Sequence, residues 1–157
     1  SHIGYCAALP PPNFDRYLDW VDQGYAGGMS YLSRPDALEK RADPRKLLPS
    51  AESIMVFAMP YQPTTLEDND PARPSVAAYA WGEDYHHVIP AQLEKLMGWL
   101  RGKTGTAHLE YRIFTDSGPL LERSYAVAAG LGWIGKNACL IIPGRGSFCF
   151  LAENTLF

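Results

Sequence analysis

The chain has 157 residues, of which 46% are hydrophobic and 20% charged, and its formal net charge is −3. These values are typical of one globular domain with a substantial core, and the charge argues against nucleic-acid binding by bulk electrostatics alone. No apolar run is long enough to span a membrane, and the N-terminus lacks the features of a signal peptide. The three cysteines have no metal-ligand spacing, so we expect a reducing, cytoplasmic setting.

The first half of the chain predicts a helix, a strand and a loop. Apolar side chains recur at helical spacing from 14 to 21, between Asn13, a suitable N-cap, and Gly24, a stop signal. The apolar run 53–59 lies between two prolines and predicts a buried strand. The polar, proline-containing segment 62–74 is expected to be an exposed loop.

The middle of the chain predicts two strands and a helix between them. Residues 76–81 are expected to form a short strand, and residues 85–101 a helix that Asp84 caps. Pro90 is compatible with this helix only within its first turns. A further strand is predicted over 109–114.

The last third predicts a helix followed by a hairpin. The helix covers 120–129, with Pro119 at its first position and Gly130 just beyond its end. Two strands, 138–142 and 147–152, are joined by a glycine-rich turn and predict a hairpin.

The order of the elements predicts an α/β or α+β fold with a mixed sheet. Cys139 and Cys149 lie in apolar strands and are expected to be buried thiols. The chain does not begin with Met and stops at Phe157 without a polar tail. We therefore expect residues 1–157 to form a single domain of a longer protein.

Asp116 is the most informative candidate residue, because it follows a predicted strand and precedes the turn residues Ser117 and Gly118. It could cap this turn by accepting hydrogen bonds from backbone amides. Alternatively it could be a general acid, since a carboxyl group in a partly desolvated pocket has a raised pKa and holds a proton near neutral pH. The residue pattern leaves both interpretations open.

Two neighbouring features follow Asp116. Glu122 and Arg123 are typical of a solvated helix face, although Arg123 could instead meet a phosphate or carboxylate near the same pocket. The run 130–137 is no phosphate loop, because Lys136 is followed by Asn137 and the glycine spacing does not match a nucleotide-binding pattern. Its glycines either form a tight helix-to-strand connection or let the backbone approach a flat ligand.

Two further runs allow both a structural and a functional interpretation. The aromatic and histidine-rich run 79–87 predicts a helix start or an aromatic wall for a bulky ligand, while zinc would need more ligands. The basic run 40–46 is typical of a solvated loop, or it supplies an arginine to an amide or phosphate of a ligand.

Six short runs, in this order, resemble the epoxyqueuosine reductase family over nearly the whole chain from about Gly24 onward. No single run is diagnostic, but their common order is specific. They are Gly27–Leu32, Arg41–Pro44 with Leu47–Pro49, Tyr79–His86, Asp116–Arg123, Ala129–Asn137 and Gly146–Leu151.

The resemblance implies a cobalamin-binding catalytic domain related in fold to nitroreductases and reductive dehalogenases. It implies reduction of epoxyqueuosine to queuosine at the wobble position of a tRNA anticodon. It also implies electron transfer to cobalamin from iron–sulfur (4Fe–4S) clusters that an external donor reduces, and a monomeric enzyme. Opening an epoxide places negative charge on oxygen, which suits a proton donor in the site.

The resemblance also assigns roles to residues. Asp116 matches the proposed proton donor above the cobalt, and Arg123 matches a residue that faces the tRNA. The remaining positions match residues along the cofactor: Arg41, Ala80, Tyr85, His86, Lys136, Asn137, Leu140, Ile141, Ile142 and Leu151.

The chain departs from the family in one respect. The cysteine signature of a ferredoxin-like iron–sulfur domain is absent from it. We therefore expect the clusters in another part of the protein or in a separate chain, and we expect this chain alone to be inactive. Two alternatives remain open: a cobalamin-binding module without turnover, and a paralogous reductase of another substrate, such as an organohalide.

Overall fold

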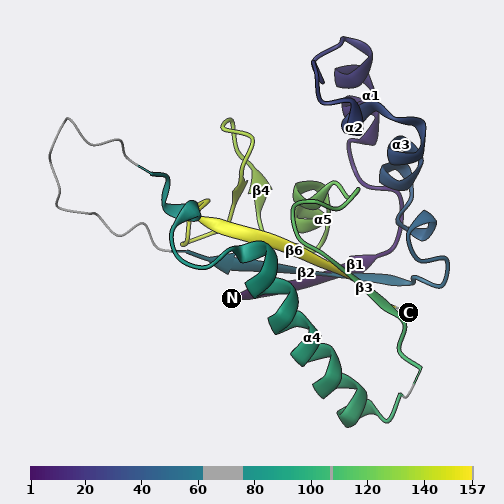
Figure 1. Ribbon diagram of the computed structural model, residues 1–157, viewed down its shortest axis with the longest axis vertical. Helices are drawn as coiled ribbons and strands as arrows, with labels where there is room; N and C mark the ends of the chain where they lie inside the picture. The colour runs from purple at the N-terminus through teal and green to yellow at the C-terminus, as the bar shows by residue number, and fades with distance from the viewer. Residues whose placement is uncertain (62–75, 107, 157) are drawn as a thin grey trace, which may run out of the picture.

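A four-stranded antiparallel sheet forms the centre of the computed structural model, which describes residues 1–61, 76–106 and 108–156 (Figure 1). The predicted loop 62–74 lies outside these residues. In sheet order the strands are β1 (His2–Ala7), β2 (Ser53–Pro60), β6 (Cys149–Leu156) and β3 (Tyr111–Phe114).

The sheet is not mixed, so that part of the fold prediction is wrong. β6 lies between β2 and β3 and pairs antiparallel with both. The connection from β2 to β3 is therefore a crossover between parallel strands, as in an α/β unit, but the last strand of the chain separates them. β1 pairs antiparallel with β2 and completes the sheet.

Each face of the sheet carries one helix and one hydrophobic cluster (Figure 1). Helix α4 (Tyr85–Thr104) covers one face, where Ile89 and Leu93 pack with Phe57 and Ala152. It begins at Tyr85 as predicted and extends three residues beyond the predicted end at 101, and Asp84 is its N-cap, whose carboxylate accepts a hydrogen bond from the His86 backbone N–H. Within the described residues no helix is both long and apolar enough to cross a membrane.

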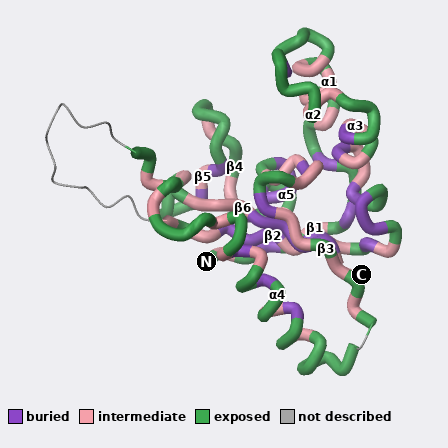
Figure 2. The backbone as a smooth tube through the Cα atoms, viewed as in Figure 1, coloured by how far each residue is buried: buried purple, intermediate pink, exposed green. Residues whose placement is uncertain are grey.

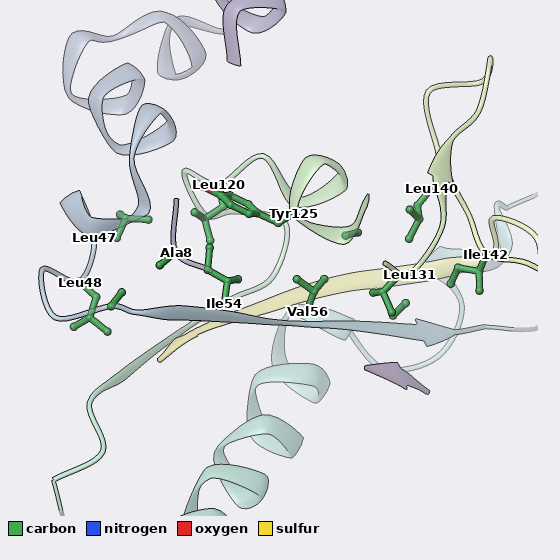
Figure 3. Close-up of a cluster of buried hydrophobic side chains, with 13 residues drawn as sticks. Ala8, Leu47, Leu48, Ile54, Val56, Leu120, Tyr125, Leu131, Leu140 and Ile142 are labelled. Carbon is green, nitrogen blue, oxygen red and sulfur yellow. The ribbon is translucent and has the colours of Figure 1, made fainter. Parts of the chain in front are cut away.

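Helix α5 (Glu122–Ala128) covers the opposite face and places Tyr125 against Ile54 and Val56 (Figure 3). Side chains alternate along a strand, so Ile54 and Val56 face α5 whereas Phe57 faces α4. Burial of such side chains contributes about 1.5–3 kcal/mol each. The predicted buried strand 53–59 is therefore confirmed.

Helix α5 starts later than the sequence predicts. The predicted range 120–129 with Pro119 at the first helical position is wrong, because the N-cap is Leu121. Leu120 is buried in the core, and the chain is still turning there. Gly130 does follow the helix end with a φ of 74°, as predicted.

Short helices form a separate lobe beside α5 (Figure 1). They are α1 (Phe14–Asp22), α2 (Ser30–Ser33), α3 (Pro35–Ala42) and the 3-10 helix η1 (Pro44–Lys46). The helix predicted over 14–21 is confirmed, although the side chain of Asn13 makes no capping bond. Figure 2 shows this lobe mostly exposed or intermediate. Arg41 is an exception: it is buried, so a purely solvated basic loop is wrong.

Between α5 and β6 the chain forms a smaller two-stranded sheet of β4 (Trp133–Ile134) and β5 (Leu140–Ile141). The predicted turn is present, because Ile142 and Gly146 exchange two backbone hydrogen bonds. The predicted hairpin is nevertheless wrong, because β5 pairs with β4 and β6 pairs in the main sheet. A turn signal is local and does not specify which strands pair.

Two smaller predictions are also wrong. Residues 76–81 contain the 3-10 helix η2 (Ala78–Ala80) rather than a strand. Cys139 is exposed and Cys149 half-buried, because Cys139 precedes β5 on a protruding turn.

Candidate functional site

Asp116 lies in the connection between β3 and α5 in an unusual backbone conformation. Its φ of 58° is left-handed, which Asp tolerates better than most residues. The Ser117 N–H donates to the Thr115 carbonyl at 2.6 Å and tightens the turn. The side chain of Asp116 is 63% exposed, so this loop presents the carboxyl group at the surface.

The Asp116 carboxylate bonds to the start of α4. Its Oδ2 accepts the Tyr85 hydroxyl at 3.1 Å and faces the His86 Nε2 at 3.3 Å. The bonds of the carboxylate therefore go to side chains that precede it by about thirty positions, and the turn-cap interpretation is not supported. The predicted strand end and the run 79–87 thus meet in one place.

His86 is shared between two carboxylates. Its Nδ1 lies 2.8 Å from Asp84 Oδ1, and its Nε2 faces Asp116. A neutral imidazole has only one N–H, so both contacts are hydrogen bonds only when the ring is protonated. The pKa of His86 is accordingly raised, mainly by the bond to Asp84 and further by Asp116.

Tyr85 connects the carboxylate to the aromatic part of the site. Its ring stacks on Phe150 of β6 at a centroid distance of 4.2 Å. Desolvation, followed by the bond to Asp116, raises the pKa of Tyr85 to about 12. The hydroxyl therefore stays protonated and donates to Asp116 at physiological pH.

Glu122 is the functional candidate that the sequence interpretation missed. Its Oε1 accepts the backbone N–H of Asp116 at 2.6 Å. Burial raises the pKa of Glu122 to about 7, and the negative charge of Asp116 adds to this effect. A solvated helix face is therefore wrong for Glu122. Arg123 beside it is exposed, and its guanidinium donates to the Ala138 carbonyl at 2.6 Å.

Two cavities meet at this loop and share Asp116, Glu122 and Arg123 as a common wall. The first, of about 420 Å³, lies against the helical lobe and is lined by residues such as Tyr17, Leu32, Arg41 and Ile134. The second, of about 270 Å³, lies over β6 and is lined by residues such as Tyr61, Tyr85, Leu140 and Leu151.

Arg41 gives the first cavity an unsatisfied donor. Its guanidinium lies 5.5 Å from the centre of the Tyr17 ring. Its Nη1 is buried and has no hydrogen-bond partner within the described part of the chain. A buried donor without a partner is costly, so this arrangement suits an acceptor supplied by a ligand.

The other predicted cofactor residues are only partly brought together. Leu140 and Leu151 line the second cavity, and Ala80 lines a hollow with Tyr85 and His86. Ile142 is buried in the core. Ile141 belongs to β5, and Lys136 and Asn137 are exposed on the turn before it; none of the three is among the residues that line the two cavities at Asp116.

The glycine run 130–137 has a structural explanation. A Cβ at Gly132 would collide with the carbonyl oxygen of Ile141, so only glycine fits where the run passes β5. A Cβ at Gly135 would meet only side-chain atoms, the nearest being Asn137 Oδ1 at 2.8 Å, so this position is less restrictive. The tight-connection interpretation therefore accounts for these glycines.

Comparisons with known proteins identify the family. The family model described as "Epoxyqueuosine reductase QueG, DUF1730" matches residues 41–117. An epoxyqueuosine reductase from Cyclobacterium marinum is 42% identical over 135 residues, covering 86% of this chain and 42% of the relative.

Solved structures agree with the sequence relatives. The epoxyqueuosine reductase from Streptococcus thermophilus has a TM-score of 0.82 and 29% identity, covering 99% of this chain and 42% of that one. An epoxyqueuosine reductase solved with an epoxyqueuosine-modified tRNA-Tyr stem loop has a TM-score of 0.81 and 30% identity, covering 99% and 41%.

The fold and the site define an α+β domain that presents one aspartate between two cavities. The chain belongs to the epoxyqueuosine reductase family, which confirms the resemblance of its six sequence runs. It spans less than half the length of the relatives it matches.

Proposed function

We propose that residues 1–157 form the catalytic, cobalamin-binding domain of an enzyme that reduces epoxyqueuosine in tRNA to queuosine. Asp116 is the proton donor in this proposal. The observation that supports it most is the placement of Asp116, which a left-handed loop presents at the junction of two cavities. The proposed substrate is inferred from the relatives, which are named epoxyqueuosine reductases.

Opening of an epoxide requires a proton donor near the epoxide oxygen, and Asp116 is the proposed donor. An epoxide that opens leaves negative charge on its oxygen, and a positioned acid that protonates it accelerates the step by about 10²–10⁴-fold. Tyr85 and His86 orient the Asp116 carboxyl group through their bonds to Oδ2. When His86 is protonated, its Nε2 carries a proton next to this oxygen. That proton can be transferred to Asp116 after Asp116 has given up its own.

The exposure of Asp116 modifies the expectation of a partly desolvated pocket. Its side chain is 63% exposed in this chain. Desolvation of this carboxyl group must therefore come from the molecules that bind over it. A bound cofactor and substrate would provide this cover.

The lining of the site suits cobalamin in its chemistry. Tyr61, Leu140 and Leu151 offer apolar surface to a large ring, and the free Nη1 of Arg41 suits a phosphate or amide at its edge. Each cavity is smaller than so large a molecule requires, so other parts of the protein would share it. When bound, reduced cobalamin supplies the electrons for the reaction. The other proposed contacts are Ala80, Tyr85, His86, Lys136, Asn137, Ile141 and Ile142.

Arg123 is the proposed contact to tRNA. Within the described residues its guanidinium makes one hydrogen bond, to the Ala138 carbonyl, and its other donors suit a phosphate. The net charge of −3 is consistent with local rather than bulk contact to tRNA. We place the 4Fe–4S clusters outside this chain, with an external electron donor, and expect a cytoplasmic monomer.

The direct test is conversion by the full-length protein. It is loaded with cobalamin, supplied with a low-potential reductant and incubated with tRNA that carries epoxyqueuosine. Mass spectrometry of the nucleosides is expected to show queuosine replacing epoxyqueuosine. A protein that retains the visible corrin spectrum after gel filtration but makes no queuosine would instead be a binding module, or a reductase of another substrate such as an organohalide.

A further inference from the structure

Glu122 makes the shortest contact to the Asp116 backbone. The Glu122 Oε1 accepts the Asp116 N–H at 2.6 Å. This bond joins the first residue of α5 to the loop six positions earlier, so the start of the helix and the acid are linked directly. Bonds to a carboxylate are stronger than bonds between neutral groups.

The hydrogen bond from the Asp116 amide to Glu122 lies at a residue with an uncommon backbone conformation. Asp116 has a φ of 58°, a conformation that non-glycine residues keep only when their surroundings impose it. The side chain of Asp116 is exposed, and its two partners both come from the start of α4. Without Glu122 the described contacts leave the Asp116 amide without a hydrogen-bond acceptor.

We propose that Glu122 is a positioning residue, whose carboxylate holds Asp116 in the left-handed conformation that presents its carboxyl group to both cavities. This inference rests on the proposed role of Asp116 as proton donor. Glu122 itself lines both cavities but needs no contact with the reacting atoms. Its role is to fix the direction in which the acid points.

The charge of Glu122 changes within the physiological range, since burial raises its pKa to about 7. The groups that face it are Asp116 from the loop, Arg123 from its own helix, His86 from α4 and Glu153 from β6. The negative charge of Asp116 favours its neutral form, whereas the bond from the Asp116 amide, Arg123 and protonated His86 favour the ionised form. The ionised carboxylate is the stronger acceptor, so the bond to Asp116 strengthens as pH rises through about 7.

The test compares Glu122→Ala and Glu122→Gln in the full-length protein, with Glu52→Ala as a control for loss of an exposed glutamate before β2. Hydrogen exchange of the Asp116 amide is expected to accelerate at least about tenfold in Glu122→Ala and to stay near wild type in Glu122→Gln, which keeps an acceptor oxygen. The kcat for queuosine formation is expected to fall about 100-fold in Glu122→Ala, with the KM for tRNA unchanged.

A second measurement covers the case in which Glu122→Ala does not fold. The NMR shift of the Asp116 amide in the wild type is expected to titrate with a midpoint of about 7, and this titration is expected to disappear in Glu122→Gln. Unchanged amide exchange in a folded Glu122→Ala, or no such titration in the wild type, overturns the inference. Neither of these readouts requires activity, so an inactive wild type would count against the proposed function alone.

Discussion

The imidazole of His86 lies between the carboxylates of Asp84 and Asp116, and its charge depends on both. The bond to Asp84 is the larger cause of its raised pKa. Because the folded-state pKa exceeds the unfolded value, the pairing stabilises the fold below pH 6.5 and this contribution is lost as pH rises through the folded pKa. Protonated His86 is also the state that keeps Asp116 oriented.

Asp84→Asn is therefore expected to lower the pKa of His86 more than Asp116→Asn does. Each variant removes one negative partner, but the bond to Asp84 is shorter, at 2.8 Å against 3.3 Å. The measurement is an NMR titration of the imidazole carbons, with the remote His108 ring as an internal reference. If the pKa of His86 decreased more in Asp116→Asn than in Asp84→Asn, the conclusion that Asp84 is the stronger partner of His86 would be wrong.

At this scale the sequence predicted the positions of the site residues better than their contacts. Asp116 was found because it follows an apolar strand, and the run 79–87 because aromatic and histidine side chains gather there. Their meeting depends on how α4 packs across the sheet, which no local pattern contains. Glu122 was missed because a glutamate at the start of a helix resembles a solvated residue. The turn residues just before it were the available signal that its carboxylate faces a loop.

At the scale of elements, the β4–β5 sheet depends on a close backbone approach. Gly132 passes β5 so closely that a methyl group would meet the carbonyl oxygen of Ile141. This sheet positions Ile134 against the first cavity and Leu140 against the second. Its geometry therefore shapes both cavities beside Asp116.

Gly132→Ala is expected to destabilise the protein by about 1–3 kcal/mol, because the backbone atoms that it meets cannot move aside easily. Gly98→Ala is the matched control. Gly98 lies inside α4 with open space around it, so alanine there is expected to stabilise by about 1 kcal/mol through helix propensity. Urea unfolding of both variants gives the comparison. Equal free energies of unfolding for Gly132→Ala and wild type would refute the close approach.

The sequence predicted the elements that carry an apolar pattern over many residues. It did not predict the short strands that form only because another strand lies beside them. α4 has an apolar face over several turns and β2 is a continuous apolar run, so both ranges were nearly right. β1 contains Gly4 and exposed apolar side chains and was not anticipated. β4 consists of two residues within a glycine run, and it became a strand only because β5 lies opposite.

At the scale of the whole molecule, a carboxyl group is buried on the face of the sheet that α5 covers, because Glu153 pairs with Val56 across the strands. Glu153 on β6 is completely buried, and neither of its carboxyl oxygens has a partner among the described residues. Burial raises its pKa well above the ordinary value, and the nearby Glu122 adds to this effect. Burial therefore favours the neutral form of Glu153 in the folded protein.

The contribution of Glu153 to the stability of the fold is expected to fall as pH rises. A raised folded-state pKa contributes stability that is fully present below the ordinary value of 4.5 and is lost as pH rises through the folded value. Glu153→Gln removes this ionisation, so it is expected to match wild type near pH 5 and to exceed it by at least about 1 kcal/mol at pH 8. Urea denaturation at the two pH values measures the difference, and the same difference at both would contradict a neutral Glu153.

The family resemblance was the most far-reaching prediction from the sequence, because six runs in a fixed order constrain more than any single motif. The comparisons confirm it, while the predicted fold class was right in combining helices with a sheet and wrong in expecting a mixed sheet, because the strands pair antiparallel. The cofactor and tRNA contacts stay predictions. They depend on molecules that would bind beside Asp116.

The most direct test of the account is the turnover of Asp116→Asn in the full-length protein. Asparagine keeps the shape and tolerates the left-handed backbone but cannot donate a proton as an acid. Queuosine formation is expected to fall at least about 100-fold while the corrin spectrum is retained, and Asp22→Asn on exposed α1 is expected to behave as wild type. Undiminished queuosine formation by Asp116→Asn would contradict the central claim that Asp116 supplies the proton.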